Sequence, residues 1–134
     1  MKSVRIRIGD EGSITALVVV LAMTFVACAG LAVDGGRLVA AKIELGDHAE
    51  NAARAGAQEV TSLRSGSLEI NESQAVYAAE EYLAAHGIDG DVHIQNNSVN
   101  VYVSRDIPMT LLSLFGVDGK TLSAQRSATP VDGS

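Results

Sequence analysis

One uncharged apolar run constrains most strongly what this chain can fold into. Residues 13–33 contain no Asp, Glu, Lys or Arg over twenty-one consecutive positions. As a helix that rises about 1.5 Å per residue, the run would extend about 31 Å, which is close to the hydrocarbon thickness of a bilayer. We therefore expect residues 13–33 to form a transmembrane helix.

The charges around this run predict its orientation. Short loops that stay in the cytoplasm are enriched in Lys and Arg. Three basic residues precede the run, at Lys2, Arg5 and Arg7. Asp10 and Glu11 oppose them only weakly, because acidic residues contribute little to this rule. We expect a single-pass protein of the cell membrane, with residues 1–12 in the cytoplasm and the C-terminal domain outside.

Two short motifs within the run leave other fates open. The sequence ACA, ending at Ala29, fits the small-x-small pattern of a signal-peptidase site. The sequence FVAC, ending at Cys28, resembles a bacterial lipobox with Phe25 in place of the usual leucine. The protein would then be an extracytoplasmic binding domain, secreted after Ala29 or anchored at a lipidated Cys28. We favour the retained anchor, because the apolar pattern continues to Val33 and no flexible polar tether follows Cys28.

The chain beyond the run is acidic and poor in aromatic residues. From Asp34 onward it carries seven basic and fourteen acidic residues, a net charge of −7. Phe, Tyr and Trp make up 4% of the chain, which leaves few rings for stacking on bases. We therefore expect no nucleic-acid binding. Cys28 is the single cysteine, which excludes an intramolecular disulfide.

A stripe of small residues follows the run. Residues 34–65 read as an Ala/Gly-rich helical region, because small residues recur there at helical spacing. Small side chains let another element approach a helix closely. The candidate helix-packing residues are Ala49, Ala52, Ala53, Gly56 and Ala57. They could pack on the chain's own sheet, which we favour, or on a partner helix in a homo- or hetero-oligomer.

Polar and glycine residues mark the ends of the predicted span. The candidate membrane-boundary residues are Gly12 on the inner side and Asp34 and Arg37 on the outer side. We favour an interfacial Asp34 over a buried one. Further along, Gly46 is followed by a capping pattern that begins at Asp47. We therefore expect a kink or a helix break near Gly46.

Residues 66–128 predict an extracytoplasmic domain that begins with a helix. A loop is expected at residues 65–67, where the sequence reads Ser-Gly-Ser. Asn71 can cap a helix that runs through His86 and ends at Gly87. The apolar stripe of this helix would be formed by Val76, Ala79 and Leu83.

The strongest local prediction is a β-hairpin. Asn96 and Asn97 suit a two-residue turn with positive backbone angles. If Gln95 pairs with Ser98, the apolar residues of both strands face the same side of the sheet. This register would pair Ile94 with Val99 and Val92 with Val101.

A short turn and a third strand complete the predicted sheet. Thr110 can cap a turn over residues 111–115, which Gly116 closes. Residues 120–128 alternate as a strand, and residues 129–134 read as a frayed tail. The inward positions of this strand would be Leu122 and Ala124. The fold class is therefore α+β. A transmembrane helix continues into an Ala-rich helix, and a further helix then packs on a small, about three-stranded antiparallel sheet.

The residues that could carry chemistry are scattered. His48 lies one turn after Glu44, but no third ligand has metal-site spacing, so we expect a solvated side chain. His93 falls on the polar face of the hairpin. The sequence contains no nucleophile elbow and no glycine-rich phosphate loop after a strand. We expect no catalytic activity, no metal and no cofactor.

The order of these motifs resembles a known family. Gly12 and Ser13 precede the span, the sequence DGGR from Asp34 to Arg37 ends it, and the sequence AGA ends at Ala57. This order is similar to the N-terminal region of TadE/TadG-like (Flp/Tad) pilus-assembly proteins. The later helix, the valine-rich hairpin, the LLSLFG turn and the final strand are similar to shorter, actinobacterial-type members.

The resemblance implies a pilin-like fold and a function. It implies a membrane-anchored, minor pseudopilin-like accessory component of bacterial Tad pilus assembly or secretion, whose partners are pilus or secretion-machinery subunits. One feature departs from processed members, which have a glutamate five residues after a cleavage-site glycine. The corresponding residue is Leu17 after Gly12 and Ile14 after Gly9, so prepilin-type cleavage is not expected.

Overall fold

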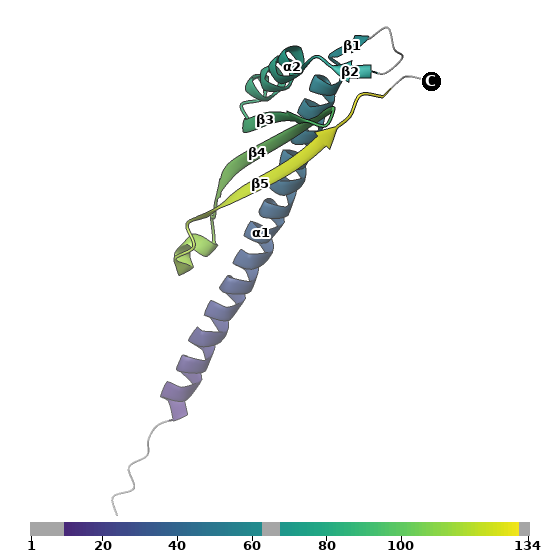
Figure 1. Ribbon diagram of the computed structural model, residues 1–134. Coiled ribbons are helices and arrows are strands. Elements are labelled where there is room, and N and C mark those ends of the chain that lie inside the picture. Colours follow the sequence, from purple (N-terminus) through teal and green to yellow (C-terminus); the bar gives the residue numbers. More distant parts are fainter. Residues whose placement is uncertain (1–9, 63–67, 132–134) are drawn as a thin grey trace, which may run out of the picture.

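A single long helix forms the axis of the molecule, and a small domain is built on its C-terminal part (Figure 1). The computed structural model describes residues 10–62 and 68–131. The fold is α+β, as the sequence predicts. Its elements, in chain order, are α1 (Asp10–Ala57), β1 (Val60–Ser62), β2 (Leu68–Ile70), α2 (Glu72–Ala85), β3 (Asp89–Gln95), β4 (Ser98–Pro108), the 3-10 helix η1 (Leu112–Phe115) and β5 (Gly119–Ala128).

Helix α1 continues without a break through Gly46, so the expected kink there is wrong. Gly46 is buried beneath the Arg126 side chain of β5. A Cβ atom at this position would lie 2.9 Å from a guanidinium nitrogen of Arg126. The glycine therefore leaves room for the Arg126 side chain on the surface of the helix. Packing of α1 on the sheet outweighs the local cost of about 1 kcal/mol for a glycine within a helix.

Strands β3, β4 and β5 form an antiparallel sheet in that order. Gln95 pairs with Ser98, and both turn residues, Asn96 and Asn97, have positive φ angles of 50° and 59°. The predicted register is confirmed, including the pairs Ile94–Val99 and Val92–Val101. The hairpin is predictable because its turn residues and its apolar alternation are both local properties of the sequence.

The segment after α1 differs from the expected helical region. The helix ends at Ala57 and does not continue toward residue 65; instead β1 pairs antiparallel with β2. Each of these strands has three residues, too few to show an alternating pattern in the sequence. The Ser-Gly-Ser loop predicted at residues 65–67 lies outside the described residues.

Helix α2 begins and ends as predicted. The Asn71 side chain accepts a hydrogen bond from the Gln74 backbone N–H at 3.3 Å, and Gly87 follows the helix with a φ angle of 63°. Ala79 and Leu83 of the expected stripe are buried. The third buried position is Ala75, one residue before the expected Val76, which is half-buried.

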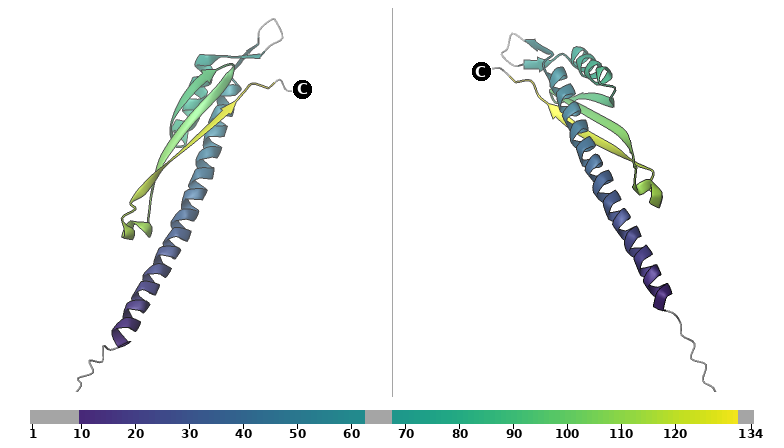
Figure 2. Two further views of the ribbon diagram at one scale, coloured as in Figure 1. Left: turned by 60° about the horizontal axis from the view of Figure 1, so that its bottom comes forward. Right: turned by 180° about the vertical axis from the view of Figure 1, so that it is seen from behind.

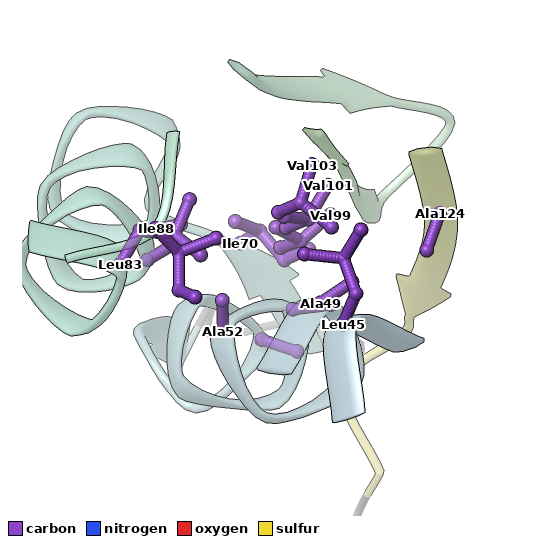
Figure 3. Close-up of a cluster of buried hydrophobic side chains, with 14 residues drawn as sticks. Leu45, Ala49, Ala52, Ile70, Leu83, Ile88, Val99, Val101, Val103 and Ala124 are labelled. Atoms are coloured by element: carbon purple, nitrogen blue, oxygen red, sulfur yellow. The ribbon is translucent and has the colours of Figure 1, made fainter. Parts of the chain in front are cut away.

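The core lies between α1, α2 and one face of the three-stranded sheet (Figures 1 and 2). Valine side chains of β4 point toward the small residues of α1 (Figure 3). The expected inward residue Ala124 is buried, and Leu122 is partly buried against the core. The buried apolar residues are Leu45, Ala49, Ala52, Ala53, Ala57, Ile70, Ala75, Ala79, Leu83, Ile88, Val99, Val101, Val103 and Ala124.

The turn residue Asn97 also ties the hairpin to β2. Its side-chain oxygen accepts from the Ile70 N–H at 2.9 Å, and its side-chain nitrogen donates to the Leu68 carbonyl at 2.9 Å. The Asn97 side chain therefore pairs with the backbone of β2 through one accepted and one donated hydrogen bond, as the backbone of a neighbouring strand would.

Replacing Asn97 by glycine separates its role in the hairpin turn from the role of its side chain in binding β2. Asn97→Gly keeps a residue that tolerates positive φ but removes both bonds to β2. We expect the Ile70 amide to exchange with solvent roughly tenfold faster, as for the loss of one hydrogen bond. Hydrogen-exchange NMR measures this, with Asn96→Gly in the same turn as the control. Equal exchange at Ile70 in the two variants would contradict the role assigned to the Asn97 side chain.

Candidate functional site: the docking of the domain on α1

The five candidate helix-packing residues lie on one buried face of α1. Ala49, Ala52, Ala53 and Ala57 belong to the core, and Gly56 is buried with them. A Cβ atom on Gly56 would lie 2.8 Å from the Ala75 carbonyl oxygen and 3.1 Å from a Val99 methyl carbon. The close approach that small residues permit is therefore made to α2 and β4 of the same chain. These five residues are covered by the chain's own domain and are not exposed to a partner helix.

Polar contacts fix the middle of α1 against the sheet. Arg105 of β4 donates a hydrogen bond to the Glu44 carboxylate at 3.3 Å. Lys42 donates to the backbone carbonyl of Ser123 on β5. These two side chains of α1 lie two residues apart and contact different strands, so they join the helix to both β4 and β5.

Asp34 makes the most unusual contact of the molecule. Its side chain is 1% exposed, although the sequence favoured an interfacial position over a buried one. Its Oδ2 accepts from the N–H groups of Leu111 and Leu112, each at 2.8 Å, and both carboxylate oxygens lie 3.2 Å from the Thr110 nitrogen. Three backbone donors at the start of η1 thus converge on one carboxylate.

This contact corrects the expected cap of the turn. Thr110 was expected to cap it, but Asp34 provides the cap from α1, across more than seventy residues. The Thr110 hydroxyl instead accepts a hydrogen bond from Arg37. The predicted closing residue Gly116 does end η1, with a φ angle of 85°. We call Asp34, Arg37 and the Thr110–Leu112 backbone the Asp34 latch.

The latch keeps Asp34 ionised. The backbone hydrogen bond from Leu112 lowers the pKa of Asp34 below its ordinary value of 3.8, and burial acts in the opposite direction. The Thr110 and Leu111 N–H groups and the positive charge of Arg37, whose Nη1 lies 4.0 Å from Oδ1, lower the pKa further. At neutral pH the carboxylate is therefore charged, and hydrogen bonds to a charged acceptor are the stronger kind.

Gly30 makes room for the latch one turn before Asp34. It is buried, and a Cβ atom there would lie 3.2 Å from the Leu111 Cβ. Gly30 and Asp34 therefore share one face of α1, against which η1 rests. A glycine and an aspartate four residues apart near the end of an apolar run are visible in the sequence, but their partner at residues 110–112 is not.

The histidines differ in their burial and in their contacts. His48 was expected to be solvated, but it is half-buried between the helices, with Nδ1 3.3 Å from the Tyr82 hydroxyl and its ring centroid 5.1 Å from that of His86. This cluster joins α1 to α2, which local spacing could not predict. His93 is exposed on β3, opposite Asn100, as expected. Within residues 10–62 and 68–131, no group of three or more His, Cys, Asp or Glu side chains could hold a metal ion.

The N-terminal part of α1 projects beyond the folded domain (Figure 2). Its large apolar side chains are exposed, and Cys28 is exposed among them. By length and composition, α1 could cross a membrane once. The assignment of Gly12, Asp34 and Arg37 to the membrane boundaries stays a prediction, and so do the limits 13–33 of the span.

Comparison with known proteins finds a similarity in the segment that contains most of α1. Residues 12–59 match the family model described as putative Flp pilus-assembly TadE/G-like, which confirms the resemblance of this N-terminal region to that family. No curated protein and no solved structure matches the chain. The matched segment contains Gly30, Asp34, Arg37 and the small-residue face, whereas the groups that they contact lie mostly beyond it.

Proposed function

We propose that this protein is a membrane-anchored accessory component of Tad (Flp-type) pilus assembly or secretion, minor pseudopilin-like, which acts through protein–protein contacts and not through catalysis. The observation that carries the proposal is the match of residues 12–59 to the TadE/G-like pilus-assembly family. Pilus or secretion-machinery subunits are the proposed partners. The pilus-assembly description of the family accords with an organising role.

The geometry of α1 supports a mechanism for this role. One unbroken helix carries both the exposed apolar segment and the base of the folded domain. The small-residue face holds the domain near the C-terminal end of α1, Glu44 and Arg105 hold it in the middle, and the Asp34 latch holds it next to the apolar segment. Attachment at three levels would keep the domain from swinging about the span. The protein would thus present one orientation of its sheet to its partners.

A test of the pilus role is deletion of the gene followed by complementation. We expect loss or reduction of surface filaments and recovery by the intact gene. Cross-linking in intact cells should recover pilus or secretion-machinery subunits with the wild-type protein. Normal filaments together with cross-links to none of these subunits would overturn the proposal.

Retention of the span has its own test. The helix is unbroken through Ala27, Cys28 and Ala29, which supports an intact anchor. We expect the protein recovered from membranes to have the mass of a chain that retains residues 13–33. A chain that begins at Gly30, or one that begins with an acylated Cys28, would instead establish the secreted or lipidated alternative.

A charge within the span should prevent membrane insertion. Met23 lies near the centre of residues 13–33 and is 62% exposed, and Val39, on the same helix beyond the predicted span, is 61% exposed. An arginine at the centre of a transmembrane helix costs roughly 2.5–3.5 kcal/mol on insertion scales. We expect Met23→Arg to lower the fraction recovered in sodium carbonate-washed membranes, and Val39→Arg, the matched control, to leave it unchanged. Equal recovery of the two variants would contradict the assignment of the span.

A further inference from the structure

The tip of the domain exposes apolar side chains that the core does not use. Leu114 is 73% exposed, and Phe115 and Val117 are also exposed. All three belong to η1 or to the turn after it, between β4 and β5. This tip is the part of the folded domain that extends farthest toward the N-terminal half of α1 (Figures 1 and 2).

The latch fixes the level of the tip along α1. The Leu111 Cβ lies 3.2 Å from where a Cβ on Gly30 would stand, and the Leu112 side chain lies 3.5 Å from the same point. The Leu112 N–H donates to Asp34 one turn further along. The tip is therefore level with residues 30–34, where the uncharged run of α1 ends.

The surface of α1 at this level is also apolar and exposed. Leu31 and Val33 face outward on the last turn of the run. An apolar phase that surrounds Leu31 and Val33 would also reach the tip, because the latch holds η1 against the same turn of the helix. Asp118 follows the three apolar residues and is exposed, which restricts the tip to the polar–apolar boundary.

We propose that Leu114, Phe115 and Val117 form a second membrane contact, in which the tip inserts into the outer interface of the bilayer beside α1. The inference rests on the single span of the proposed function. Exposed aromatic and aliphatic residues with a nearby charge are suited to this boundary. The chain would then meet the membrane at two points, which would set the tilt of the domain as well as its distance from the bilayer.

Lipid quenching of a single fluorophore tests the contact. The full chain with Cys28→Ser is reconstituted in phosphatidylcholine vesicles that contain lipids brominated near the headgroup or at mid-chain. An environment-sensitive dye is attached to one introduced cysteine at a time: Leu114→Cys for the tip, Tyr77→Cys as the control and Met23→Cys for the span. Tyr77 is 67% exposed on α2, so it matches Leu114 in exposure but lies away from the tip.

The inference predicts a distinct result at each position. The dye at position 114 should be quenched by shallow bromines and shifted to shorter wavelength, the dye at 23 quenched by deep bromines, and the dye at 77 unaffected. Quenching at 23 without quenching at 114 would overturn the membrane contact and leave the span intact. Quenching at neither position would overturn the span and this inference together. Equal quenching at 114 and 77 would show general adsorption and would also overturn it.

Discussion

Ala53→Leu is expected to destabilise the folded domain by about 1–3 kcal/mol, as overpacking of a close-packed core does. Ala53 is fully buried on the face of α1 that contacts α2 and the sheet. The backbones are already close there, since a Cβ on neighbouring Gly56 would stand 2.8 Å from the Ala75 carbonyl oxygen. Three further carbons therefore require α2 or β4 to move away from α1.

The measurement is thermal unfolding of the full chain in detergent micelles, followed through the tyrosine near-ultraviolet signal of the domain. For a domain of this size, each kcal/mol lowers Tm by about 4–8 °C. Asn51→Leu is the matched control, because Asn51 is exposed on the same helix and receives the same side chain. An unchanged Tm in both variants would show that the small-residue face does not require small residues.

Asp34→Asn is expected to release η1 from α1 while the rest of the domain stays folded. The asparagine keeps the size of the side chain but loses the charge and one acceptor oxygen, and its NH₂ group faces backbone donors. We expect the Leu111 and Leu112 amides to exchange roughly tenfold faster or more, as for the loss of charge-assisted hydrogen bonds. Asp47→Asn is the control, because Asp47 is exposed on the same helix. Exchange that is equally slow in Asp34→Asn would contradict the latch.

The same latch predicts a dependence on pH. Because the pKa of Asp34 is lower in the folded protein than its ordinary 3.8, its contribution to stability is fully present above pH 3.8 and is lost as the pH falls through the folded pKa. Amide exchange at Leu112, corrected for its intrinsic pH dependence, should therefore accelerate below about pH 4 in the wild-type protein. The difference in the Leu112 exchange rate between wild type and Asp34→Asn separates the effect of this carboxylate from that of others that titrate in the same pH range. If this difference in exchange rate stayed constant from pH 6 to pH 2.5, the result would contradict the role of the ionised Asp34 side chain in holding η1.

Several features were predictable from the sequence because their causes are local. The register of the hairpin follows from Asn96, Asn97 and the alternation of valines beside them. The start of α2 follows from Asn71, whose partner Gln74 is three residues away. The match of residues 12–59 to the TadE/G-like family model confirms the resemblance that the motifs of this helix indicated.

Other features depended on segments that meet only in the folded chain. A glycine before a capping pattern usually ends a helix, yet α1 continues through Gly46 because its packing on the sheet outweighs this local preference. His48 is half-buried because α2 brings Tyr82 to it. The periodicity of Ala49 and Ala53 indicated a packed face and favoured the chain's own sheet, but it gave no sign that α2 would also cover this face.

The sequence by itself determined the apolar helix, the hairpin and the α+β class, since each rests on interactions within a few residues. Only the tertiary structure decided that Asp34 is a buried cap and that the tip of the domain lies at the end of the apolar run. The physical reason is that a buried carboxylate needs partners, and its partners are backbone N–H groups at residues 110–112. Backbone donors carry no signature in the sequence, so a contact made to them appears only when the chain has folded.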